Sequence, residues 1–185
     1  PDYALGWGQK TPYTEIRLAP LNTAETDVLL EKWLGVATEL TPLKHMLAEK
    51  TNGNPFLLEE VLRSLLETHV VSGAYGQLRL TGSLSQFRVP PSVHAVISAR
   101  IDRLPATEKF LLQTAAVIGK DVPALLLEEI VDLQDQELRR SILHLEQAGF
   151  LVEERVVPTI EYAFQHWLTR DVAYESLLNE QRRAI

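Results

Sequence analysis

The clearest chemical signal in the sequence is a short turn between two helical segments, Asn52-Gly53-Asn54-Pro55. Gly53 can adopt the left-handed backbone that closes a helix. Asn54 is a favourable N-cap residue, and Pro55 suits the first helical position, where no N–H is needed. The N–H groups at a helix start can bind a nucleotide or simply be capped by the chain itself. The residues by themselves favour the plain helix turn.

A second residue with possible chemistry is His166, one of five histidines in the chain. It follows the strand-like residues 162–165 and opens the last predicted helix. A histidine there is usually an N-terminal cap or a packed ring, but an imidazole can also meet a phosphate in a neighbouring cleft. No two histidines stand three or four residues apart, so no helical metal site is encoded and we expect no bound metal.

Residue patterns of known catalytic sites are missing from the sequence. It carries no Walker A signature, no G-x-G-x-x-G motif and no G-x-S-x-G motif. It contains no cysteine, which excludes disulfides, thiolate nucleophiles and thiolate metal sites. No Ser–His–acid pattern stands out, so we assign no catalytic residue to this chain.

The composition describes an acidic protein with enough apolar residues for a core. Hydrophobic residues make up 45% of the 185 positions, and the formal net charge is -7. That charge disfavours binding to nucleic acid or to an anionic membrane, since both need clustered positive charge. No apolar run approaches the roughly 20 residues that span a bilayer. We therefore expect neither nucleic acid nor membrane as a partner. The absence of cysteine favours a reducing compartment, so we expect a cytoplasmic protein.

The N-terminal part is predicted to be a helical bundle with a short β-hairpin. Residues 13–18 alternate with period two and indicate one strand. Helical patterns occupy four stretches, which are 22–35, 41–53, 55 to about 68, and about 92 to 103. The stretches 70–72 and 77–80 indicate the hairpin.

Helical periodicity also predicts which side chains face the core. Asn22 and Glu25 form a predicted capping box at the start of the first helix. Val28 and Trp33 are expected on the inner face of that helix, and Glu60 on the outer face of the third.

The C-terminal part is predicted to be a winged helix that begins after a boundary at Pro105. Its expected elements are three helices, two strands and a final helix, at 108–118, 123–131, 135–148, 150–154, 159–164 and 166–178. The predicted fold class is therefore mainly α, a helical bundle with a short β-hairpin followed by a winged-helix domain.

A winged helix first suggests DNA binding, with residues 135–147 as the candidate recognition helix. Arg139 and Arg140 are its only cations, and its N-terminal turn is acidic. The predicted wing also carries more glutamates than arginines. Phosphate contacts need the opposite sign, so the sequence favours a packing module. A DNA-binding winged-helix transcriptional regulator is the alternative function, in which both arginines would matter.

Arg100 and Arg103 form a separate basic pair near the end of a predicted helix. We interpret the pair as complementing the helix dipole, with a local ion pair. A binding role for it stays open.

Five phrases of the sequence resemble a known family when they are taken together and in order. They are TNGNPFLLEE (51–60), VPPSV (89–93), ARIDRLP (99–105), AAVIG (115–119) and YAFQHWLTRDVAYESLL (162–178). They resemble the AAA-like ATPase module of the STAND class of signalling NTPases. The nearest likeness is to bacterial proteins in which this module follows a class III adenylate/guanylate cyclase domain.

The resemblance implies a division of the chain into three parts. Residues 1–20 would be the tail strand of a truncated P-loop ATPase core, 21–104 the helical lid and 105–185 the winged helix. The Walker A and Walker B segments and the sensor arginine of the family would then lie outside this sequence. We therefore expect the chain to be a piece of a longer protein.

The resemblance also implies which residues bind the nucleotide. In this family the lid's Gly-x-Pro turn lies over the adenine and ribose, and here that turn is Gly53-Asn54-Pro55. The family's winged-helix histidine reaches the β-phosphate of bound ADP, and His166 is the matching residue. The expected cofactor-binding residues are therefore Gly53, Asn54, Pro55 and His166.

The function implied by the resemblance is a nucleotide-dependent hinge in signal transduction. Exchange of ADP for ATP would swing the winged helix away from the core and pass the change to an effector, an adenylate/guanylate cyclase. The expected partners are the missing P-loop core and the effector domains of the same chain. The parent would be an ATPase, whereas this piece would be no enzyme alone and would hold no ATP or ADP by itself.

Overall fold

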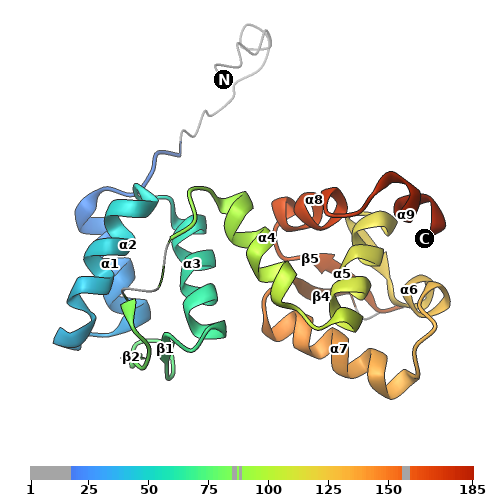
Figure 1. Ribbon diagram of the computed structural model, residues 1–185, viewed down its shortest axis with the longest axis horizontal. Coiled ribbons are helices and arrows are strands. Elements are labelled where there is room, and N and C mark those ends of the chain that lie inside the picture. Colours follow the sequence, from blue (N-terminus) through green and yellow to red (C-terminus); the bar gives the residue numbers. More distant parts are fainter. Residues whose placement is uncertain (1–17, 85–86, 88, 156–158) are drawn as a thin grey trace, which may run out of the picture.

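The computed structural model describes residues 18–84, 87, 89–155 and 159–185. This part of the chain is mainly helical, as predicted, with two small antiparallel sheets (Figure 1). The strand predicted at 13–18 lies outside the described residues, apart from Leu18. The molecule is elongated, with two groups of elements joined by one helix between them (Figure 1).

The first group, which we call the N-terminal bundle, contains α1 (Thr23–Leu34), η1 (Thr38–Leu40), α2 (Thr41–Thr51), α3 (Pro55–Glu67), β1 (Val71–Ser72) and β2 (Arg79–Leu80). The capping box is confirmed, since Asn22 and Glu25 exchange hydrogen bonds of 3.0 Å and 2.9 Å. The predicted hairpin is confirmed by the β1–β2 pairing. The prediction for the inner face of α1 is wrong in part, because Val28 is 67% exposed whereas Leu30 and Leu34 are buried. Packing against α2 selects that buried stripe, and local apolarity alone does not reveal it.

The second group, which we call the C-terminal unit, contains eight elements in the residues that the structure describes. They are α5 (Ala106–Ile118), β3 (Asp121–Pro123), α6 (Ala124–Ile130), α7 (Asp135–Gln147), β4 (Leu151–Arg155), β5 (Glu161–Phe164), α8 (Trp167–Glu175) and α9 (Asn179–Ala184).

The sheet of the C-terminal unit differs from the prediction. Its strand order is β3-β5-β4, with Val122 opposite Tyr162, so the expected pair of strands has a third member. β3 is three residues long and includes Pro123, so it shows no alternating pattern of its own. The final helix also ends earlier than expected, because α8 stops at Glu175 and α9 follows as a separate helix.

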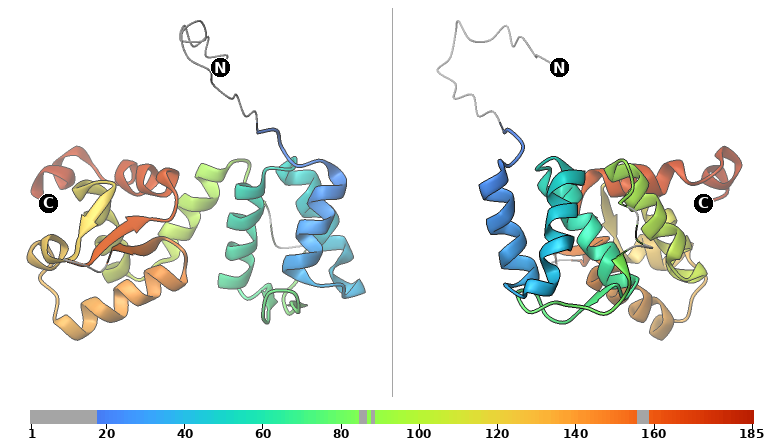
Figure 2. Two further views of the ribbon diagram at one scale, coloured as in Figure 1. Left: turned by 180° about the vertical axis from the view of Figure 1, so that it is seen from behind. Right: turned by 60° about the vertical axis from the view of Figure 1, so that its left-hand side comes forward.

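The helix α4 (Val93–Arg103) joins the two groups (Figure 2). Ser92 caps it through its side-chain oxygen. Val96 belongs to the hydrophobic core of the N-terminal bundle, whereas Ile97 and Ile101 belong to the core of the C-terminal unit. Because one helix contributes to both cores, its two faces set how the bundle and the unit meet. Among the described residues, no helix is long and apolar enough to cross a bilayer.

Candidate functional site

The turn between α2 and α3 has the local geometry that the sequence predicts. After α2, Asn52 (φ 49°) and Gly53 (φ 70°) both adopt left-handed backbone conformations. Asn54 caps α3, because its side-chain oxygen accepts from the backbone N–H three residues on at 3.0 Å. Pro55 is the first residue of α3. The side-chain oxygen of Asn54 is therefore already occupied by a hydrogen bond within α3.

Gly53 also anchors the chain that enters the bundle. The Leu21 N–H donates to the Gly53 carbonyl at 2.8 Å. A Cβ on Gly53 would lie 2.0 Å from the Leu21 carbonyl oxygen. The position therefore needs glycine for its left-handed backbone and for this close approach.

We expect Gly53→Ala to lower the free energy of unfolding by about 2–3 kcal/mol. The left-handed backbone costs a residue with a Cβ about 1 kcal/mol, and the hydrogen bond from Leu21 adds about 1 kcal/mol when the clash breaks it. Urea denaturation of both proteins measures the difference. The matched control is Asn52→Gly, which relieves a left-handed residue and should not destabilise the protein. A Gly53→Ala variant as stable as the wild type would contradict this account.

A hollow of about 510 Å³ lies beside the turn. Its lining includes Asn52 and Gly53, with further residues from the entering chain, α1 and α2, namely Leu21, Asn22, Thr23, Thr26, His45, Ala48 and Glu49. The volume lies within the range of small-ligand sites. Of the four predicted cofactor residues, Gly53 lines this hollow, whereas Asn54, Pro55 and His166 do not.

His166 approaches the turn from the C-terminal unit. Its ring stacks on Phe56, with 3.7 Å between ring centroids and 17° between ring planes. Phe56 directly follows Pro55, so the stack sets His166 next to the residues that the sequence singles out. The tertiary structure thus brings His166 to the first turn of α3, whereas the hollow that Gly53 lines contains no residue of the C-terminal unit.

The protonation of His166 follows from its contacts. Its Nδ1 accepts from the Leu168 N–H at 3.2 Å and caps α8, so in the neutral ring Nε2 carries the proton. Burial lowers the pKa of His166 below its ordinary value, and the fields of Glu60 and Glu59 offset this only in part. The cap and the packed ring foreseen from the sequence therefore occur together. A neutral imidazole with an Nε2–H can donate a hydrogen bond to a phosphate oxygen.

The lowered pKa of His166 predicts how stability depends on pH. The unfolded chain takes up this proton near the ordinary pKa of about 6.5, whereas the folded protein does so at a lower pH. Between the two pKa values the unfolded state binds more protons, so the free energy of unfolding falls as the pH drops through that window. His166→Asn keeps a capping acceptor and should remove this contribution. Urea denaturation across the window compares the variants, and identical pH profiles would refute the prediction.

A buried ion-pair network joins α3 to α4. Arg100 is 1% exposed, and its Nη1 donates to Glu60 Oε2 at 2.6 Å. Glu67 Oε1 lies 2.8 Å from Nε and 2.6 Å from Nη2 of the same guanidinium. Burial opposes the charge, but hydrogen bonds and charge from Glu67 and Glu60 outweigh it and raise the pKa of Arg100. The network therefore keeps a charged arginine inside the protein.

The same guanidinium also reaches the C-terminal unit. Arg100 Nη2 donates to the carbonyl oxygen of Ala148, at the end of α7, at 2.5 Å. Arg63 of α3 donates to that oxygen at 3.4 Å. Arg100 also lies 4.5 Å from the centroid of the Phe150 ring. We call this contact, formed by Arg63, Arg100 and the Ala148 carbonyl, the arginine latch.

Two interpretations made from the sequence are wrong in this region. Glu60, expected on the outer face of α3, is 4% exposed because it faces Arg100. Arg100 makes no local pair at its helix end, since its partners come from α3 and α7. Arg103 bonds to Ser64 Oγ at 2.9 Å and to Glu67 at 3.2 Å. The network could have been predicted from the helical spacing of Glu60, Ser64 and Glu67, which places the three side chains on one face of α3.

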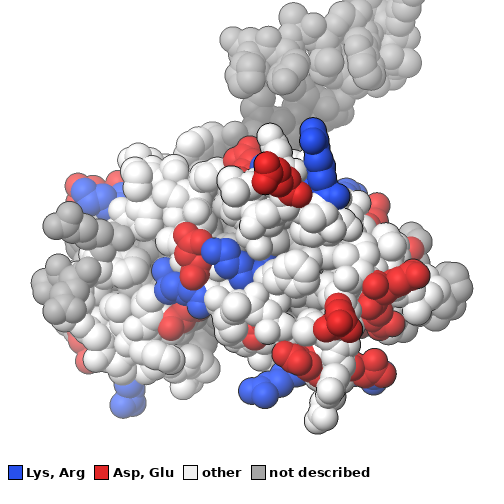
Figure 3. Space-filling model, turned by 45° about the vertical axis from the view of Figure 1, so that its right-hand side comes forward, with Lys and Arg blue, Asp and Glu red and all other residues white. Residues whose placement is uncertain are grey.

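Charge on the surface is distributed unevenly. On the face in Figure 3, acidic side chains gather at the lower right, and basic ones lie in small groups, some beside acidic ones. Arg139 and Arg140 of the candidate recognition helix are both exposed. Among the described residues, no cluster of three or more His, Asp or Glu side chains could hold a metal ion.

In comparisons with known proteins, no protein-family model and no curated protein matches this sequence. The candidate site therefore rests on its own geometry. It is the seam at which the Phe56–His166 stack, directly after the turn, and the arginine latch join the N-terminal bundle to the C-terminal unit.

Proposed function

We propose that this chain is the lid and winged-helix portion of a STAND-type signalling ATPase, where it acts as a nucleotide-dependent switch. The observation that carries the proposal is the stack of His166 on Phe56. An ADP site of this kind needs the lid turn and the winged-helix histidine side by side. The two positions lie on elements with separate hydrophobic cores, so their meeting is no consequence of local sequence.

The order of elements in the C-terminal unit supports the winged-helix part of the proposal. Three helices, α5, α6 and α7, precede the paired strands β4 and β5, and β3 between α5 and α6 completes the sheet. In this assignment β4 and β5 are the wing. The N-terminal bundle, with its hairpin, is then the lid.

The residues at the seam fit ADP or ATP as the ligand. Bound nucleotide would supply phosphate oxygens, which are acceptors for the Nε2–H of His166. Gly53 lines the hollow beside the turn, where its backbone would face the ligand. ATP hydrolysis belongs to the P-loop core of the parent protein, so no residue of this chain is assigned a catalytic role.

The switch works through the seam. ADP in contact with His166 would favour the closed arrangement, and exchange for ATP would favour release of the winged helix. The released winged helix would pass the change to an effector domain of the same protein, for which an adenylate/guanylate cyclase is our candidate. The arginine latch holds the same two parts together and must open in that step.

Isothermal titration calorimetry tests the proposal on residues 1–185. We expect ATP and ADP to bind this chain with a Kd weaker than about 1 mM, because the phosphate loop that supplies most of the affinity is elsewhere. The parent protein with its P-loop core should bind ADP at about 1 μM or tighter. Micromolar binding by this chain alone, or no binding by the parent, would contradict the assignment.

A further inference from the structure

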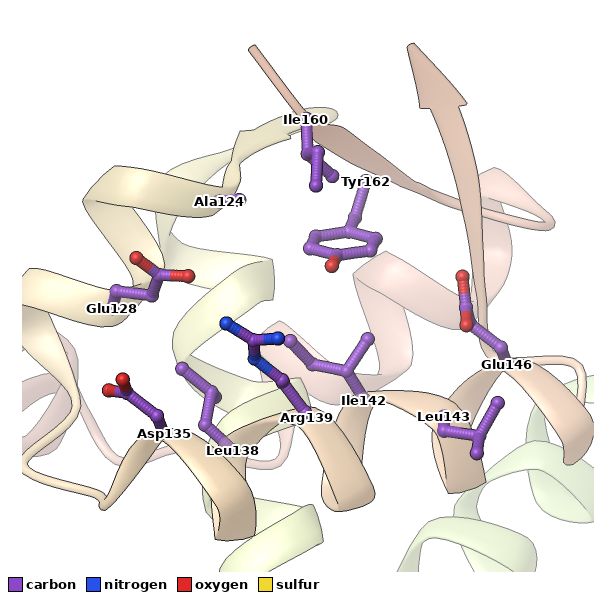
Figure 4. A pocket seen from close by; sticks show the side chains of 10 residues that line it. All are labelled: Ala124, Glu128, Asp135, Leu138, Arg139, Ile142, Leu143, Glu146, Ile160 and Tyr162. Carbon is purple, nitrogen blue, oxygen red and sulfur yellow. The ribbon is translucent and has the colours of Figure 1, made fainter. Parts of the chain in front are cut away.

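A second cavity, of about 420 Å³, opens between α6, α7 and β5 of the C-terminal unit (Figure 4). Its floor is formed by the apolar side chains of Leu138 and Ile142 of α7 and by Tyr162 of β5, all of which are buried. Leu143 and Ile160 are large hydrophobic side chains that line the cavity and are exposed to solvent. The cavity shares no lining residue with the turn, the stack or the latch, so it is independent of the proposed nucleotide site.

The polar side chains around this floor are mostly acidic. Glu128, Asp135 and Glu146 set three carboxylates against the single guanidinium of Arg139, which points into the cavity (Figure 4). Within the described part of the chain, no salt bridge joins Arg139 to any of the three. Burial is the main cause that raises the pKa of the Tyr162 hydroxyl, while Glu146, Glu153 and Glu128 add to it and Arg139 opposes it.

We propose that this cavity docks a cationic amphipathic peptide segment of a partner protein. An apolar side chain of the segment rests on the floor formed by Leu138, Ile142 and Tyr162. Lys or Arg side chains next to that apolar side chain pair with the carboxylates of Glu128, Asp135 and Glu146, which form the rim of the cavity. Exposed apolar side chains surrounded by polar groups are typical of protein interaction sites. The excess of carboxylates selects a cationic segment over an anionic one.

The test uses residues 1–185 and two fluorescein-labelled model helices, one of Leu and Lys and one of Leu and Glu, in fluorescence anisotropy. We expect the Leu/Lys peptide to bind and the Leu/Glu peptide not to bind. Glu128→Gln, Asp135→Asn and Glu146→Gln, made together, should weaken binding about tenfold. The absence of Leu/Lys binding, or a preference for Leu/Glu, would overturn the proposal.

A matched triple variant separates this site from general attraction by an acidic protein. Glu129→Gln, Glu137→Gln and Glu154→Gln change the net charge equally at exposed positions of the C-terminal unit that do not line the cavity. Binding should change less than twofold in this control. Equal losses in the two triple variants would overturn the proposal.

Arg139→Gln gives a second readout with the opposite sign. Removing the cation should tighten binding of the Leu/Lys peptide about threefold, since one repulsive charge is lost. Weaker binding would instead identify Arg139 as an anchor for an anion and overturn the proposal. If the triple variant of Glu128, Asp135 and Glu146 fails to fold, Arg139→Gln by itself still tests the proposal.

Discussion

Replacing Arg100 with methionine should lower the free energy of unfolding by about 3–5 kcal/mol. The substitution leaves the Glu60 carboxylate, which is 4% exposed, without its partner at 2.6 Å. It also removes the donor to the Ala148 carbonyl at 2.5 Å. An unpaired buried charge is among the most costly defects in a folded protein, because neither water nor a counter-charge compensates it. Urea denaturation of both proteins measures the loss.

Two further variants separate the buried pair from a general effect of removing an arginine. Arg103→Met takes a guanidinium from the same helix, but that side chain is 39% exposed, so the loss should stay below about 1 kcal/mol. Arg100→Met combined with Glu60→Leu removes both buried charges and should recover part of the stability. If Arg100→Met costs no more than Arg103→Met, the network has no special role.

The proposed function predicts that the parent protein binds ADP more weakly when His166 is replaced by alanine. A hydrogen bond to a charged group contributes about 1.5–3 kcal/mol, which corresponds to a roughly 10- to 150-fold weaker Kd. The stack on Phe56 at 3.7 Å disappears as well, which loosens the seam. Equilibrium binding of ADP and the rate of its exchange for ATP measure the effect. Unchanged affinity and exchange rate would refute the nucleotide role of His166.

Controls distinguish loss of the nucleotide contact from loss of structure. His166→Asn keeps an acceptor for the cap of α8, so the protein should remain folded while ADP binding still weakens. His94→Ala removes an exposed imidazole on α4, which lies 3.3 Å from Glu175, and should leave ADP binding unchanged. Equal effects of His166→Ala and His94→Ala would point to a general disturbance of the seam.

The arginine latch suggests how the seam can open without exposing a charge to an apolar environment. Arg100 keeps both of its carboxylate partners, Glu60 and Glu67, on α3 of the N-terminal bundle. An opening that leaves α4 with α3 would keep the ion pairs and break the bonds to the Ala148 carbonyl, the contact of Arg100 with Phe150 and the Phe56–His166 stack. It would also withdraw Ile97 and Ile101 from the core of the C-terminal unit. A two-state switch needs two stable arrangements, and in both of these the Arg100 charge would keep its carboxylate partners Glu60 and Glu67.

Preferences of single residues and their near neighbours are sufficient to predict most of the helices and the turn at Gly53. The caps at Asn22, Asn54 and Ser92 and the left-handed Gly53 follow from preferences of one or a few neighbouring residues. The resemblance to STAND modules likewise rests on short phrases of the sequence, and the site that it implies, Gly53, Asn54, Pro55 and His166, remains a prediction. The hairpin and the mainly α fold class also follow from patterns within single segments.

The helices, their caps and the glycine turn can be predicted from the amino-acid sequence, because they depend on contacts within a few residues. Long-range packing is needed to bury Glu60 against Arg100, to add β3 to the sheet and to stack His166 on Phe56. Each of these joins segments far apart in the chain. The Glu60–Arg100 pair and the His166–Phe56 stack depend on how α4 sets the bundle against the C-terminal unit, whereas β3 pairs with β5 within that unit. Helical periodicity shows that a face is buried, but which partner covers that face is decided by long-range packing.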